Sequence, residues 1–136
     1  MSAYVIFAID NDDDLHTNAK FMRYMDEARA MGKLKGNCVL CIGSYNDVLE
    51  RSYLVSAYDF VNVVADSGYL DNQESILSLE TGYKGRTYAT LRYRKGNADP
   101  ISLGEFRSIS PYEIGEHRSW TYRPDLGIYF VADGGQ

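Results

Sequence analysis

Residues 38–57, CVLCIGSYNDVLERSYLVSA, decide the fold that this sequence predicts. Cys38–Ile42 is a short apolar run that is typical of a buried strand. Residues 50–57 then alternate between two faces with a period of two, as a half-buried strand does. We expect these two strands to pair antiparallel through a connecting loop. Tyr45 and Glu50 would then lie near the same end of the sheet.

The patterns on both sides of this stretch complete a β-α-β-β-α-β-β order. The expected helices run from Leu15 to about Met31 and from Tyr58 to about Ala65, and the other expected strands are Tyr4–Ile9, Glu74–Leu79 and Thr87–Tyr93. The first six elements have the order of the split βαβ, ferredoxin-like arrangement. The sequence therefore predicts an α+β fold with a ferredoxin-like (βαββαβ) core and an extra strand.

A hairpin is also expected near the C-terminus. Trp120–Tyr122 and Ile128–Val131 flank residues 123–127, whose Pro, Asp and Gly are typical of a turn. The polar stretch 95–100 separates this hairpin from the strands before it. We therefore expect a single domain, residues 1–136, with a core at about 3–94 and a C-terminal β-hairpin extension at about 95–136.

Composition and charge limit the possible partners. The 136 residues carry a net charge of −5, which argues against binding to the phosphate backbone of nucleic acids. No apolar run approaches the roughly 18 residues that span a bilayer, so no membrane contact is expected. The N-terminus lacks the basic region and cleavage site of a signal peptide. The only two cysteines lie within an expected strand, and a reduced, cytoplasmic location is the default prediction.

Two motifs that could indicate a metal do not hold up. Asp10, Asp12 and Asp14 have the spacing of an EF-hand, but Leu15 and Phe21 occupy the positions that need Gly and Glu. This acidic run suits the N-terminus of a helix better. The Cys-x-x-Cys motif at residues 38–41 lies in a strand, where side chains three apart point to opposite faces. We expect neither a metal nor a cofactor.

The candidates that remain are Tyr45, Glu50 and Glu74, all at strand ends. Strand ends are places where side chains can converge on a ligand while a rigid sheet holds them. Taken alone, a glutamate at such a position is more often solvated or part of a salt bridge. From these residues alone, both an acidic, aromatic site and an ordinary polar surface are possible.

Six segments carry a resemblance to a known family. They are Tyr4–Ile9 with the Asp/Asn-rich loop after it, Ile42–Tyr45, Glu50–Val55, Asn72–Leu77, Ala89–Gly96 and the C-terminal hairpin. In this order and spacing the chain resembles the small phage-encoded enzymes that degrade S-adenosylmethionine, which are called S-adenosylmethionine hydrolases or lyases.

The resemblance implies a fold, an assembly and a reaction. It implies a PII-like core assembled as a homotrimer with ligand sites between subunits, in the cytoplasm of the host cell. The implied reaction is an intramolecular, metal-independent cleavage of S-adenosylmethionine to 5′-methylthioadenosine and L-homoserine lactone. Such an activity would let a phage deplete the methyl donor that host defences use. The resemblance places the catalytic glutamate at Glu50 and substrate-binding residues at Ser44, Tyr45, Gln73 and Glu74.

Other functions stay open at this point. A PII-like sensor could bind an adenine nucleotide at the same place without catalysis, although the candidate loops are poor in basic residues and glycine. A protein that inhibits a host protein by direct contact would have no turnover. A true hydrolase, with Glu50 activating water, would give homoserine instead of the lactone.

Overall fold

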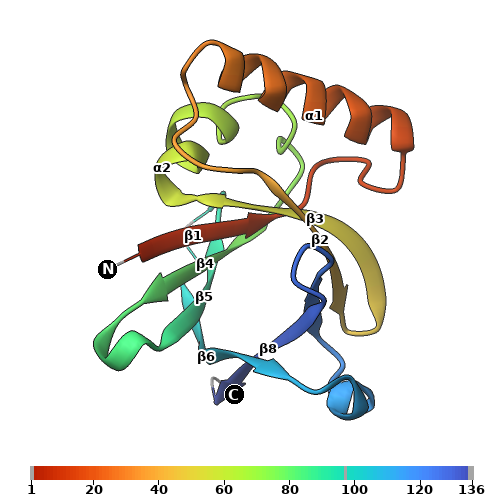
Figure 1. The fold of residues 1–136 in the computed structure, drawn as a ribbon, viewed down its shortest axis with the longest axis vertical. Coiled ribbons are helices and arrows are strands. Elements are labelled where there is room, and N and C mark those ends of the chain that lie inside the picture. Colours follow the sequence, from red (N-terminus) through yellow and green to blue (C-terminus); the bar gives the residue numbers. More distant parts are fainter. Residues whose placement is uncertain (1, 97, 135–136) are drawn as a thin grey trace.

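The computed structural model describes residues 2–96 and 98–134 and contains a closed antiparallel β-barrel of eight strands (Figure 1). The strands are β1 (Ser2–Phe7), β2 (Val39–Tyr45), β3 (Val48–Ser56), β4 (Ser75–Thr81), β5 (Thr87–Tyr93), β6 (Ile101–Ile109), β7 (Trp120–Arg123) and β8 (Ile128–Gly134). The helices are α1 (Leu15–Ala30), the short α2 (Ala57–Asp59) that continues as a π-helical turn η1 (Phe60–Val64), and two 3₁₀ turns, η2 (Tyr83–Gly85) and η3 (Pro111–Glu116).

The order of strands around the barrel is β1-β3-β2-β7-β8-β6-β5-β4. Neighbours in sequence pair as hairpins in β2–β3, β4–β5, β5–β6 and β7–β8. The pairs β1–β4, β1–β3, β6–β8 and β2–β7 join strands that are distant in the chain and close the barrel.

Helix α1 begins where the acidic run was expected to start a helix. The Asp14 carboxylate accepts hydrogen bonds from the backbone N–H of His16 (3.1 Å) and the hydroxyl of Thr17 (2.7 Å), which satisfies the exposed donors of the first turn. Helices α1 and α2 lie together on one side of the barrel, above β1 and β3 (Figure 1). A hydrophobic core lies between these helices and the barrel, and its buried side chains include Phe7, Phe21 and Tyr53.

The barrel interior forms a second core. Because side chains alternate along a strand, one face of each strand points into the barrel. Its buried members are Ile6, Cys41, Leu54, Leu77, Leu79 and Ala89. This second core separates two cavities that open at opposite ends of the strands.

The predicted ferredoxin-like, PII-like core with a C-terminal hairpin extension is wrong. Strands β4, β1, β3 and β2 do lie side by side in that order, but β5 pairs with the β4 edge and β7 with the β2 edge. The segment after residue 95 therefore forms three strands of a closed barrel and is no appendage. The sequence pattern did not predict strand β6. A bulge at Gly104, whose φ is +84°, lies opposite Ala89 and Thr90 and interrupts the alternation of inward and outward side chains along this strand.

The individual elements agree better with the sequence. The helix expected from Leu15 to about Met31 is confirmed as α1, the strand at Thr87–Tyr93 is confirmed as β5, and the C-terminal hairpin is confirmed as β7–β8. None of the helices within the described residues is both long and apolar enough to cross a membrane.

Candidate functional site

A cavity of about 450 Å³ opens at the end of the barrel where β2 ends and β3 and β4 begin. Tyr45, Glu50, Gln73 and Glu74 all line it, although they come from three separate segments of the chain. The remaining lining residues are Ile6, Phe7, Ala8, Ser52, Asn72, Ser75, Ile76, Leu77 and Leu91. The cavity thus combines an apolar wall with polar groups from strand ends, an arrangement common in small-molecule sites.

Gly43 makes room for the tyrosine in this cavity. In the β2–β3 hairpin Gly43 lies opposite Glu50, and Tyr45 is two residues further along the same face. A Cβ atom at Gly43 would lie only 3.3 Å from Cε2 of Tyr45, so the aromatic ring lies across the glycine. The ring is thereby held beside the Glu50 position.

The hairpin turn fixes this geometry. Asn46 and Asp47 both have positive φ, +49° and +70°, as a two-residue turn matched to the twist of the strands requires. Strand β3 therefore begins at Val48, directly after the turn, and Glu50 lies inside the paired region rather than at its first residue.

Burial raises the pKa values of both Glu50 and Tyr45. The pKa of the half-buried Glu50 carboxyl is raised, first because burial penalises its charge and second because Asp12 is nearby. Burial raises the pKa of Tyr45 to about 12, with a further contribution from the charge of Glu50, while a hydrogen bond with Thr121 opposes the shift. The site therefore holds a neutral phenol and a carboxylate that would gain from a cationic ligand.

Asp10 holds the segment that carries Gln73. Its carboxylate accepts hydrogen bonds from the backbone N–H of Asn72 (3.0 and 3.2 Å) and from the side-chain amide of Gln73 (3.1 Å). The backbone N–H of Asp10 donates in turn to the carbonyl of Tyr69 (2.8 Å). These bonds orient the Gln73 amide before any ligand is bound.

Arg94 holds the same segment from the other side. Its guanidinium donates to the carbonyls of Ala65 (3.1 Å), Leu70 and Gln73 (3.4 Å). Its backbone N–H donates to the carbonyl of Glu74 (2.8 Å). One side chain thus satisfies several loop carbonyls directly before β4.

Asp12 holds the start of β3 in a similar way, through hydrogen bonds to Arg51. Its carboxylate accepts the backbone N–H of Arg51 (3.1 Å), and its carbonyl accepts the Arg51 guanidinium (3.2 Å) and the Asn18 amide (2.7 Å). The Asn18 side-chain oxygen accepts the buried hydroxyl of Tyr53 at 2.5 Å. Helix α1, the acidic loop and β3 are therefore joined beside Glu50.

One predicted site residue lies elsewhere. Ser44 is buried on the opposite face of β2, and its hydroxyl donates to the carbonyl of Arg118 (3.2 Å). It does not line the cavity, and its observed contact supports the loop before β7.

The cysteines have the properties of structural thiols. Burial raises the pKa of Cys38 to about 12 and that of Cys41 to about 11, which disfavours the reactive thiolate. Within residues 2–96 and 98–134, no group of three or more His, Cys, Asp or Glu side chains is placed to hold a metal ion.

Sequence reasoning missed the residues that support the site. Asp10 and Asp12 were interpreted only as helix-start residues, whereas the structure uses them as acceptors for the two segments that carry Gln73 and Glu50. Ser52 could have been found, because the alternation of residues 50–57 places it on the Glu50 face. Arg94 gave no signal of its own, since its role depends on long-range contacts.

Comparison of the chain with models of known protein families and with curated proteins finds no match. The site must therefore be interpreted from its own chemistry. It offers two carboxylates, a neutral phenol and an oriented amide around a partly apolar cavity, and no Lys or Arg is among its described lining residues. Such a site suits a small ligand that carries positive charge and hydrogen-bonding groups.

Proposed function

We propose that this protein is an S-adenosylmethionine lyase. One observation carries the proposal: Tyr45, Glu50, Gln73 and Glu74, to which the family resemblance gives roles in substrate binding and catalysis, line a single cavity. They are four of the five site residues that the resemblance gives, since Ser44 lies outside the cavity, and they come from the end of β2, from β3 and from the loop before β4.

The charge of the cavity supports the same substrate. S-adenosylmethionine carries a sulfonium and an ammonium group, and two glutamates line the cavity. The environment of Glu50 disfavours its charge, so a cationic group placed beside it would relieve an existing electrostatic cost.

The proposed reaction needs no external nucleophile. The carboxylate of the substrate attacks its own γ-carbon, a C–O bond forms, and the C–S bond breaks with its electron pair moving to sulfur. The products are homoserine lactone and neutral 5′-methylthioadenosine. The protein then has to hold the folded, reactive conformer, and positioning of this kind can contribute about 7–11 kcal/mol.

Each residue has a distinct part in this proposal. Glu50 accepts hydrogen bonds from the substrate ammonium and orients the amino-acid arm. Tyr45, fixed across Gly43, packs against the adenine or faces the sulfonium. Glu74 accepts from a ribose hydroxyl or from the edge of the adenine, and the oriented amide of Gln73 supplies a further contact.

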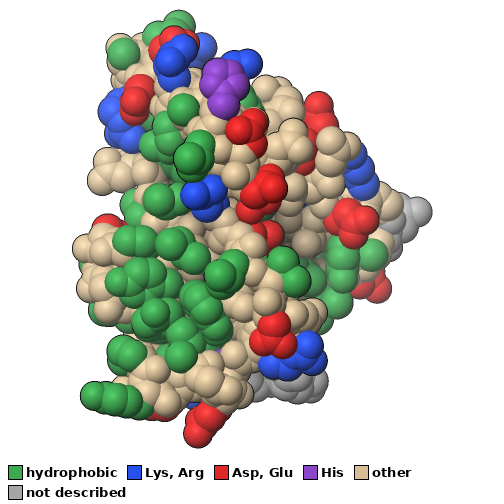
Figure 2. Space-filling view, turned by 90° about the vertical axis from the view of Figure 1, so that its right-hand side faces the viewer, with side chains coloured by type: hydrophobic (Ala, Val, Ile, Leu, Met, Phe, Trp, Pro, Cys, Tyr) green, Lys and Arg blue, Asp and Glu red, His purple; other side chains and the backbone are tan. Residues whose placement is uncertain are grey.

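The resemblance also leads us to propose a homotrimer with sites between subunits, working in a host cytoplasm to deplete the methyl donor. Exposed apolar side chains on the outer face of β2, Leu40 and Ile42, provide a surface for contact between subunits. Figure 2 shows hydrophobic side chains gathered over one part of the side of the molecule that it presents.

The test is to incubate the protein with S-adenosylmethionine and EDTA and to follow the products by mass spectrometry over minutes. We expect methylthioadenosine to appear together with the lactone, and homoserine only later as the lactone opens. Homoserine appearing first would indicate hydrolysis instead. No turnover above the spontaneous rate would refute the proposal.

A pair of variants assigns the activity to the cavity. Glu50→Gln should lower kcat/KM at least about 100-fold, because an amide cannot supply the charge that anchors the ammonium. Glu80→Gln is the matched control, since Glu80 is an exposed β4 residue outside the cavity. Equal activity in the two variants would remove Glu50 from the mechanism.

A further inference from the structure

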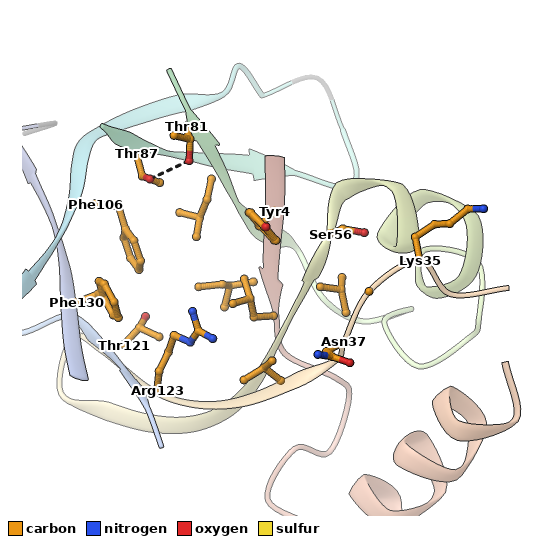
Figure 3. A pocket seen from close by; sticks show the side chains of 16 residues that line it. Tyr4, Lys35, Asn37, Ser56, Thr81, Thr87, Phe106, Thr121, Arg123 and Phe130 are labelled. Atoms are coloured by element: carbon orange, nitrogen blue, oxygen red, sulfur yellow. Dashed lines mark hydrogen bonds between the residues drawn. The ribbon is translucent and has the colours of Figure 1, made fainter. Parts of the chain in front are cut away.

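A second cavity, of about 580 Å³, opens at the opposite end of the barrel (Figure 3). The two cavities occupy opposite halves of the same strands: on β3, Glu50 and Ser52 line the first, whereas Leu54 and Ser56 line the second. Nothing in the proposed lyase reaction uses this second cavity. Its chemistry therefore needs its own explanation.

The floor and one wall of the second cavity are apolar. The floor of the second cavity is formed by Ile6, Leu54 and Leu79, which are buried members of the barrel core. Phe106 and Phe130 lie together on one side (Figure 3), with ring centroids 5.3 Å apart and an angle of 5° between the rings. Because the two rings stack on each other, another planar, apolar group can pack against an uncovered face of this stack.

The charged side chains of this cavity differ from those of the first. Its described lining contains no Asp or Glu, and Arg123 is the cation that faces it, whereas the Lys35 side chain points away (Figure 3), with Nζ 5.6 Å from the centre of the Tyr58 ring. The guanidinium of Arg123 points into the cavity (Figure 3). A buried apolar pocket with a cation at its wall is suited to an organic anion.

Arg123 already has a partner on the turn outside the cavity. Its Nε and Nη2 donate to the two carboxylate oxygens of Asp125, at 3.2 and 2.7 Å. The ion pair with Asp125 does not use Nη1 of Arg123, and this nitrogen is the one that a ligand could contact. Asp125 also holds the guanidinium in place, so the ligand does not have to order a mobile side chain.

We propose that the second cavity binds a small aromatic carboxylate, whose ring packs against Phe106 and Phe130 and whose carboxylate pairs with Arg123. This proposal is independent of the lyase activity, because it uses other residues at the other end of the barrel.

The test uses 2-naphthoate and its neutral analogue 2-naphthalenemethanol, titrated calorimetrically into the full chain. We expect the protein to bind naphthoate at least about tenfold more tightly than the alcohol, since a hydrogen bond to a charged group discriminates by about that factor. Equal affinities, or no binding of naphthoate at millimolar concentration, would overturn the proposal.

Three variants test whether Arg123 is responsible for the preference for naphthoate over the alcohol. Arg123→Met should abolish the preference for naphthoate, whereas Arg118→Met, which removes an exposed arginine that pairs with Asp47 at 3.1 Å, should leave it unchanged. Asp125→Asn should tighten naphthoate binding about threefold or more, because it removes the negative charge that competes for the Arg123 guanidinium, while an amide oxygen at this position can still accept a hydrogen bond from that guanidinium and orient it. A retained preference in folded Arg123→Met, or no tightening in Asp125→Asn, would contradict the role of Arg123.

A last control separates the two cavities. Glu50→Gln should leave naphthoate affinity unchanged, whatever its effect on S-adenosylmethionine. If this variant weakens naphthoate binding as much as Arg123→Met does, the probe binds at the first cavity and the proposal is wrong.

Discussion

Replacing Arg94 by Met should loosen the segment that presents Gln73 and Glu74. The methionine keeps the length of the apolar stem but removes the guanidinium that donates to the carbonyls of Ala65, Leu70 and Gln73. A net contribution of about 0.5–1.5 kcal/mol for each of the three hydrogen bonds gives a loss of about 1.5–4.5 kcal/mol in the free energy of unfolding. With an unfolding entropy of roughly 0.3 kcal/mol/K for a chain of this size, Tm should fall by roughly 5–16 °C.

The matched control for this prediction is Arg92→Met. Arg92 lies two residues earlier, on β5, and its Nε donates to the hydroxyl of Ser78 at 3.1 Å in an exposed hydrogen bond. Because that contact is exposed, the control should lose less than about 0.5 kcal/mol.

Urea unfolding of both variants, with amide hydrogen exchange at Asn72 and Gln73, measures the difference. The backbone N–H of Asn72 should exchange faster in Arg94→Met, since the loop that carries it opens more easily. If Arg94→Met matches Arg92→Met within about 0.5 kcal/mol and its exchange is unchanged, the arginine does not hold the segment.

Three further outcomes follow from the contacts around Glu50. If ionised Glu50 anchors the substrate, S-adenosylmethionine cleavage should decline as pH falls through the pKa of Glu50, which is raised above the usual 4.5, and Asp12→Asn should move that decline to lower pH in a pH–rate profile. Because the pKa of Glu50 is higher in the folded than in the unfolded state, its ionisation costs stability; Glu50→Gln should therefore raise the free energy of unfolding at pH 7 and lose this gain below about pH 4.5, as urea titrations at the two pH values would show. Tyr53→Phe should cost about 1–3 kcal/mol in chemical unfolding, because it leaves the buried side-chain oxygen of Asn18 without its donor, and a loss near zero would contradict that bond.

The sequence predicted local structure because local structure depends on local patterns. The alternation of residues 50–57 and the apolar spacing of α1 each follow from burial of one face, which needs no knowledge of distant strands. The hairpin around residues 123–127 follows from turn chemistry in the same way. The β2–β3 hairpin was also expected, although the tight turn at Asn46 and Asp47 was taken for a longer loop.

Closure of the barrel could not be predicted in this way. It depends on pairings such as Ile42 with Tyr122, which are set by packing and twist across the whole sheet. In addition, the bulge at Gly104 interrupts the alternating pattern by which β6 could have been predicted. A four-stranded open sheet was the simplest arrangement of the first six elements, and only the pairing of both its edges excludes it.

The grouping of four candidate residues at one cavity depends less on the overall topology than the fold does. Tyr45, Glu50, Gln73 and Glu74 lie at the cavity because they flank strand ends, and that feature is the same in an open sheet and in a barrel. Ser44 does not line this cavity, because a one-residue step along β2 reverses the direction of the side chain.

The closed barrel also determines how this protein can meet other chains. Every described strand has two hydrogen-bonded neighbours, so none of them is unpaired along a whole edge. Open sheets can grow by adding a strand from another molecule, and this is a common route both to assembly and to aggregation. None of the described strands offers such a template along its whole length, which disfavours edge-to-edge aggregation. Association through this barrel is therefore expected to use side chains on its outer surface.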